Sequence, residues 1–205
     1  MNIEEYNQIL HNHFSDAGLS DFTPIEKAMI HKVKQGKNIV IKHSDIPELK
    51  TGLQLVSILK APQAFEGSPR VLWFTSTTDK TRKRVDQLRE WIRRSEIVVE
   101  PADDKGKIIE QRNNIFDGTD IIIGTPKRML ELYNQNGYHI NQLSLVIIED
   151  LSEICKNPTL LQCIRRINES LPKVQKMVVT HGEHSKQDPF IDEIISYYDT
   201  ITSFD

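Results

Sequence analysis

Short apolar runs alternate with longer amphipathic segments along most of this 205-residue chain. The apolar runs occupy residues 38–42, 70–75, 96–100, 120–124, 143–149, 176–180 and 200–204. They are almost continuously apolar, which is typical of parallel strands buried on both faces. The segments between them predict helices at residues 48–60, 80–93, 107–116, 126–134, 158–170 and 189–197. This alternation predicts an α/β fold with a doubly wound, mostly parallel sheet of about seven strands flanked by helices.

Start signals for helices support this interpretation. Thr125 followed by Pro126 reads as an N-cap and a first helical position, and Asn157 followed by Pro158 repeats the arrangement. The chain has no internal repeat, no low-complexity tract and no clear linker, so we expect one domain over residues 1–205, with an N-terminal helix at 1–14.

Composition narrows the function classes. A net charge of −3 excludes a uniformly polybasic nucleic-acid binder, so only a local patch can have that role. Cys155 and Cys163 have neither a disulfide framework nor metal-ligand spacing around them, and they suit a reducing compartment. We find no signal peptide and no apolar run long enough for a membrane span. We therefore expect a cytoplasmic protein with no metal site of this kind and no membrane partner.

Residues 44–51, SDIPELKT, end as a phosphate-binding loop ends, between a predicted strand and a predicted helix. Lys50 and Thr51 fit such a loop, but Ser44 and Leu49 stand where its glycines belong. Pro47 also removes a backbone N–H that would face a phosphate. We therefore favour a helix-capping turn over an ordinary ATP site here.

Two acids, Glu149 and Asp150, follow the predicted strand at 143–149. Carboxylates at a strand end, downstream of a Lys-Thr pair, suggest a Walker B site, in which one acid holds Mg²⁺ and the other orients water. Acids are common at strand ends, so the indication depends on the combination with Lys50 and Thr51.

Six segments, in order, resemble the motifs of the first RecA-like domain of the DEAD-box RNA helicases. They are GLSDFTPIEKAMI at 18–30, the loop ending in Lys50-Thr51, LWFTSTTDK at 72–80, DIIIGTPKRMLEL at 120–132, LSLVIIEDLSEI at 143–154 and LPKVQKMVVTHG at 171–182. The resemblance covers residues 15–205 and implies a RecA-like, P-loop NTPase-like domain. No motif of a second helicase domain, which supplies an arginine finger in the family, is found.

Most of these motifs depart from the family pattern. Glu26 stands where the family has the glutamine that reads adenine, and a carboxylate cannot donate a hydrogen bond to a ring nitrogen. Glu149 and Asp150 look swapped relative to the family's acids, so we expect them to be vestigial as catalytic residues. Ser152 and Thr180 replace residues of two further motifs, and we expect a hydrogen bond between them to couple their loops.

The best-kept motif is Thr125-Pro126-Lys127-Arg128, which in the family contacts the RNA backbone. A helix N-terminus there suits a phosphate. Thr77 and the basic helix behind it, with Arg82, Lys83 and Arg84, would extend this surface. The alternative interpretation of the basic helix is an ordinary solvated face.

Three functions stay open at this point. The first is a degenerate, catalytically inactive domain, standing alone, that binds the backbone of RNA or single-stranded nucleic acid. The second is a protein-interaction module that docks on another helicase or a ribonucleoprotein. The third is a residual ATP-binding domain that uses Mg²⁺ and needs a second domain in trans. The glycine-free loop argues against the third, so we expect no cofactor.

Overall fold

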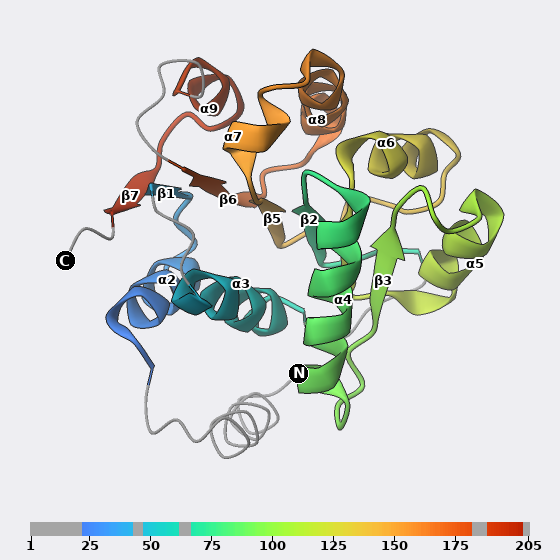
Figure 1. Cartoon of the computed structure of the whole chain (residues 1–205), viewed down its shortest axis with the longest axis horizontal. Helices are drawn as coiled ribbons and strands as arrows, with labels where there is room; N and C mark the ends of the chain where they lie inside the picture. Colours follow the sequence, from blue (N-terminus) through green and yellow to red (C-terminus); the bar gives the residue numbers. More distant parts are fainter. Residues whose placement is uncertain (1–21, 43–46, 62–66, 182–187, 203–205) are drawn as a thin grey trace.

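A seven-stranded sheet, parallel throughout, forms the centre of the domain (Figure 1). The computed structural model describes residues 22–42, 47–61, 67–181 and 188–202. The strand order is β3-β4-β2-β5-β6-β1-β7. The strands are β1 (Ile39–Lys42), β2 (Val71–Phe74), β3 (Val99–Ala102), β4 (Ile121–Gly124), β5 (Leu145–Ile148), β6 (Gln175–Thr180) and β7 (Asp199–Thr202). All seven predicted strands are confirmed, although β3 begins three residues later than expected.

Helices cover both faces of the sheet, as a doubly wound fold requires (Figure 1). One face packs against α2 (Pro24–Lys34), α3 (Pro47–Leu59) and α4 (Thr78–Ile92). The other packs against α5 (Ile108–Gly118), α6 (Pro126–Asn134), α7 (Leu151–Ile154), α8 (Pro158–Ser170) and α9 (Asp188–Ile194). The short helix α7 had no signal in the sequence pattern, and the helix expected at 1–14 lies outside the described residues.

Two apolar cores result, one on each face of the sheet. Alternate residues of the central strands enter opposite cores: in β2, Val71 and Trp73 face α2, α3 and α4, whereas Leu72 and Phe74 face the other helices. Both sets are fully buried. This explains why the strands read as continuous apolar runs, because a side chain on either face leaves water. No helix among the described residues has the length and apolarity needed to span a bilayer.

The register of the sheet aligns the carboxyl ends of its central strands. Phe74 pairs with both Gly124 and Ile148, and Ile148 pairs with Val178. The loops after β2, β4, β5 and β6 therefore emerge at the same edge, where ligands of open α/β sheets bind. All residues expected to carry chemistry at strand ends lie along this edge.

Candidate functional site

The two acids after β5 lie at the carboxyl edge of the sheet and are nearly inaccessible to water. Glu149 and Asp150 are each 5% exposed. The backbone N–H of Glu149 still donates to Phe74 O at 2.9 Å, so the sheet ladder fixes where its side chain begins. Alternation along β5 directs that side chain to the face covered by α4.

Glu149 is held by donors from β2 and α4. Arg84 of α4 donates from Nη2 to Glu149 Oε1 at 2.6 Å and from Nε to both carboxylate oxygens at 3.0 and 3.1 Å. The indole Nε1 of Trp73 donates to Glu149 Oε2 at 2.8 Å. The side chains of Arg84 and Glu149 are each 6% exposed, so this is a buried and fully paired ion pair.

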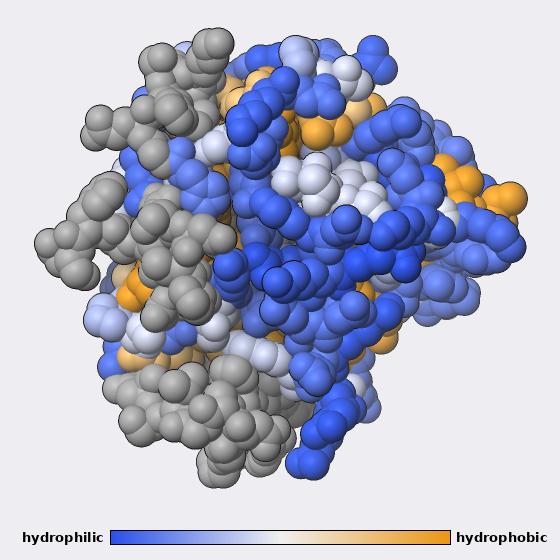
Figure 2. All heavy atoms as spheres, viewed as in Figure 1, coloured by the Kyte–Doolittle hydropathy of each residue, from blue (hydrophilic) through white to orange (hydrophobic). Residues whose placement is uncertain are grey.

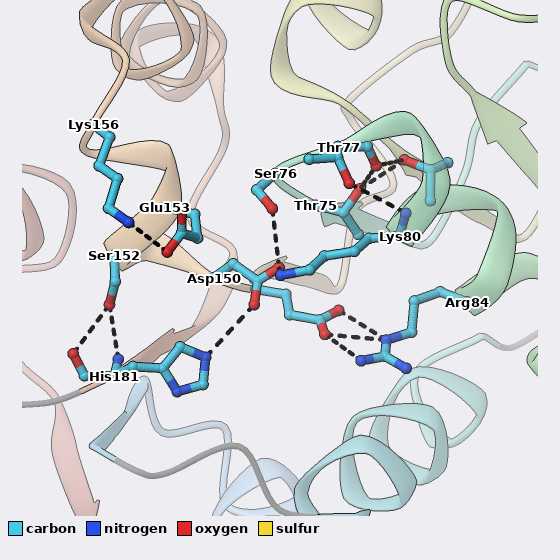
Figure 3. Close-up of polar contacts among 12 residues, drawn as sticks. Thr75, Ser76, Thr77, Lys80, Arg84, Asp150, Ser152, Glu153, Lys156 and His181 are labelled. Carbon is cyan, nitrogen blue, oxygen red and sulfur yellow. Dashed lines mark hydrogen bonds and ion pairs between the residues drawn. The ribbon is translucent and has the colours of Figure 1, made fainter.

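Asp150 is held in a similar way at the rim of the same site. Lys80 Nζ lies 2.8 Å from Asp150 Oδ2, and Ser76 Oγ donates to that oxygen at 3.2 Å. His181 Nε2 lies 3.6 Å from the other oxygen, Oδ1. Figure 3 shows Lys80 and Arg84 extending from α4 toward the end of β5, with His181 on the other side of Asp150. Asp150 has a left-handed backbone (φ 59°), which is uncommon outside glycine.

These contacts decide how well the acid pair suits a divalent metal. Mg²⁺ takes oxygen ligands at about 2.0–2.1 Å in an octahedral shell, usually several waters and one or two carboxylates whose oxygens are free to face it. Here both oxygens of Glu149 and Oδ2 of Asp150 already accept hydrogen bonds, and Oδ1 of Asp150 faces His181 Nε2 at 3.6 Å. The residues present therefore do not fit a Mg²⁺ site in this arrangement. Among the described residues, no group of three or more His, Cys, Asp or Glu side chains is placed to hold a metal ion.

The partners of these acids were not predicted from the sequence. The prediction that Arg84 lies on an outward, phosphate-contacting surface is wrong, because its guanidinium is buried against Glu149. One signal was available: Lys80 and Arg84 are four residues apart, so they lie on one face of α4. Their acidic partners lie 65 and 70 positions later in the chain, so these contacts are tertiary and cannot be predicted from neighbouring residues.

The loops after β5 and β6 are joined through Ser152, as expected, but Ser152 binds a different partner from the one expected. Ser152 Oγ donates to His181 O at 3.2 Å and accepts from His181 N at 2.8 Å (Figure 3). The side chain of Thr180 takes no part, because its Oγ1 is buried without a hydrogen-bond partner. The expected hydrogen bond between Ser152 and Thr180 is therefore wrong, because Ser152 binds the backbone of His181, the residue after Thr180.

The residues expected to bind nucleotide lie on α2 and α3. Lys50 and Thr51 lie inside α3, which begins at Pro47, while residues 43–46 of the loop lie outside the described residues. Glu26 is 4% exposed and completes a capping box: its carboxylate accepts from Thr23 N at 2.8 Å, and Thr23 caps α2. The Glu26 carboxylate therefore faces its own helix terminus.

The motif Thr125–Arg128 forms the start of α6, as expected. Thr125 is the N-cap residue and Pro126 the first helical residue, but the Thr125 side chain makes no capping hydrogen bond. The first N–H groups of a helix have no partner within the helix, so this end stays suited to an anion. The side chain of Lys127 is 59% exposed.

Arg128 differs from the exposed Lys127, because its side chain is only 10% exposed. It donates to Gly106 O at 3.1 Å and Gln111 Oε1 at 3.0 Å, and lies 3.0 Å from Glu131 Oε2. Nη2 also lies 3.3 Å from Asp104. Arg128 therefore holds the loop after β3 in place, and its expected contact with nucleic acid is not available in this conformation.

The loop after β3 also binds α4. Asp103 is fully buried and accepts from Arg82 Nε at 2.8 Å and from Nη2 at 3.1 Å. It accepts further from the backbone N–H groups of Lys105 and Gly106. The loop thus joins the first turns of α4 and α6 through Arg82 and Arg128, which the sequence did not reveal.

Comparisons with known proteins agree with this fold. A family model described as DEAD/DEAH box helicase matches residues 23–181. Saccharomyces cerevisiae Dbp5, in a structure bound to Nup159, Gle1, IP6 and ADP, has a TM-score of 0.84 over 98% of this chain and 52% of its own, at 12% identity. A hypothetical ATP-dependent RNA helicase from Sulfolobus tokodaii has a TM-score of 0.80 over 98% of this chain and 57% of its own, at 18% identity.

A third structure, a DEAD box protein from Methanococcus jannaschii, gives a TM-score of 0.80 over 94% of this chain and 52% of its own, at 14% identity. At these identities the structures show a shared fold alone. The chain spans about half the length of each of them. No curated protein matches the sequence significantly.

Proposed function

Since this chain belongs to the DEAD/DEAH box helicase family, we propose that it is a domain of that family which binds the backbone of RNA without hydrolysing ATP. The observation that carries this proposal is the pairing of both acids after β5 with Arg84 and Lys80 of α4. Hydrolysis in such folds depends on carboxylates that are free to hold Mg²⁺ and orient water. Here those carboxylates are paired with cations of α4 instead.

Exposed lysines around the N-terminal parts of α4 and α6 support RNA binding. The ion pairs of Arg82 with Asp103 and of Arg128 with Asp104 hold the loop after β3 between the two helices. Around it, Lys83 is exposed, and the side chains of Lys105, Lys107 and Lys127 are 58%, 82% and 59% exposed. We call Lys83, Lys105, Lys107 and Lys127 the lysine rim. Figure 2 shows that the face over α4 is largely hydrophilic.

Phosphates bind such a surface through charge and helix N-termini, without reading the bases. Thr77, the exposed N-cap of α4, and the uncapped start of α6 would each offer backbone N–H groups to a phosphate. We therefore expect RNA binding that does not depend on the RNA sequence and that weakens steeply as the salt concentration rises.

The experiment is a titration of fluorescent single-stranded RNA by anisotropy across a series of salt concentrations. The test variant is Lys83→Glu combined with Lys127→Glu. The matched control is Lys156→Glu, whose side chain is 70% exposed beside α8 and away from the lysine rim. We expect the double variant to lose most affinity and the slope of log affinity against log salt to fall by about 0.7 per lost contact. Equal binding by the double variant and the control would overturn the proposal.

A protein-interaction role is the second candidate. Two large apolar side chains of α5, Ile109 and Phe116, are 67% and 50% exposed, and seven residues separate them, so they lie on one helix face. Substitution of both by Ser would weaken protein binding and leave RNA binding unchanged, which separates the two functions.

A further inference from the structure

The acid pair and its two partners from α4 form a neutral group of four charges. Arg84 and Lys80 supply two positive charges, and Glu149 and Asp150 supply two negative ones. A divalent metal at such an acid pair would supply the same two positive charges. The charge balance that a metal would provide is therefore already present in side chains.

Arg84 and Lys80 differ in how deeply they are buried, and this difference suits cations that balance the charge of the acid pair. The Arg84 side chain is 6% exposed and contacts both oxygens of Glu149, whereas that of Lys80 is 43% exposed and reaches Asp150 from the rim. The hydrogen bond from Trp73 Nε1 occupies a further direction around Glu149. A metal ion approaching from solvent would meet Lys80 first and would then have to displace a buried guanidinium.

The two cations also attach a helix to the sheet. Lys80 and Arg84 are one turn apart on α4, and the acids follow β5 directly. Removing either cation would leave a buried carboxylate without its countercharge, which is unfavourable. The position of α4 relative to β5 thus depends on both ion pairs.

We propose that Arg84 and Lys80 are fixed internal cations that take the place of a divalent metal, so that the acid pair anchors α4 and binds no metal. This goes beyond the proposed function, because it concerns the acid pair and stands whether or not RNA binds to the lysine rim. It departs from the use of Mg²⁺ that the family resemblance implies.

The test measures Mn²⁺ binding by electron paramagnetic resonance, together with thermal unfolding in the presence and absence of Mn²⁺. The variants are Lys80→Gln alone and Lys80→Gln with Arg84→Gln. The matched control is Lys83→Gln, which removes a charge from the exposed face of the same helix. Neither readout depends on catalysis.

We expect the wild-type chain and the Lys83→Gln control to bind Mn²⁺ weakly and to unfold at the same temperature with or without it. The double variant should gain Mn²⁺ affinity, on the order of a hundredfold, because removing two positive charges, each about 4 Å from the ion, relieves strong repulsion. Its unfolding temperature should then rise with added Mn²⁺.

Two results would overturn the proposal. One is a Mn²⁺ site in the wild-type chain that disappears in Glu149→Gln. The other is a folded double variant that gains no affinity. If the double variant does not fold, the single variant Lys80→Gln provides the test, because it leaves the buried Arg84–Glu149 pair intact. Increased Mn²⁺ affinity of Lys80→Gln supports the proposal, and unchanged affinity overturns it.

Discussion

The guanidinium of Arg84 and the carboxylate of Glu149 make three N···O contacts of 2.6 to 3.1 Å, although 65 positions separate them in the chain. Both side chains are buried. A pair of this kind gives little net stability compared with apolar side chains of similar size, but it is costly to break. Its role is to specify which part of α4 faces the end of β5.

The first prediction concerns the stability of this pair. Arg84→Met should lower the free energy of unfolding by about 3–5 kcal/mol, because it leaves the Glu149 carboxylate buried without its cation. Arg84→Met with Glu149→Leu should recover most of that loss, because no charge then stays buried. Urea denaturation of both single variants and the double variant measures the coupling. Additive effects would show that the two side chains do not act as a pair.

The second prediction concerns Glu26. Glu26→Gln should leave the unfolding free energy within about 0.5 kcal/mol of the wild-type value, because glutamine also completes a capping box. Thr23→Ala should cost about 1 kcal/mol. Although Gln is the family residue at position 26, we expect no new heat when the Glu26→Gln variant is titrated with ATP in a calorimeter, since this side chain faces the start of α2. Nucleotide binding gained by Glu26→Gln would contradict this assignment.

The third prediction concerns the close contact between β3 and β4. A Cβ added at Gly124 would meet the carbonyl oxygen of Ala102 and lie 2.5 Å from its Cβ. Gly124→Ala should therefore cost about 1–3 kcal/mol by overpacking. Adding Ala102→Gly to the Gly124→Ala variant should restore only part of the lost stability, because the carbonyl oxygen of residue 102 stays in place. Thermal unfolding measures both effects, and full restoration would show that the backbone is not the obstacle.

The fourth prediction concerns pH and Asp199 at the start of β7. Hydrogen bonds from Lys32 at 2.7 Å and from Lys37 at 3.1 Å hold the pKa of Asp199 below its ordinary value of 3.8. A lowered folded-state pKa stabilises the fold above the ordinary value, and this stabilisation is lost as the pH falls through the folded-state value. Asp199→Asn should therefore be less stable than wild type at neutral pH.

The stability gap for Asp199→Asn should narrow when urea denaturation is repeated below the ordinary pKa of 3.8, because the wild-type carboxyl loses its charge as the pH falls through its lowered folded-state pKa. Asp117→Asn, at an exposed position of α5, serves as the control and should show no such change. A gap of equal size at both pH values would mean that the charge of Asp199 is not responsible.

The hydrophobic pattern by itself determined the sheet, most helices and the edge at which chemistry is found. Continuous apolar runs predicted parallel strands, and Thr-Pro and Asn-Pro pairs predicted the starts of α6 and α8, because burial and capping depend on neighbours in sequence. The order of the motifs also predicted the family. The placement of Glu149 and Asp150 at a strand end followed from the same local signals.

Only the tertiary structure decided what those side chains contact. Arg84 and Arg128 have the sequence features of exposed cations, yet each is buried against partners far along the chain. Ser152 binds the backbone of His181, where the sequence predicted the side chain of Thr180. A helical or strand period tells which face of an element is buried, but the partner of a polar group depends on how two elements are aligned in space, and that alignment is fixed by the packing of the whole sheet.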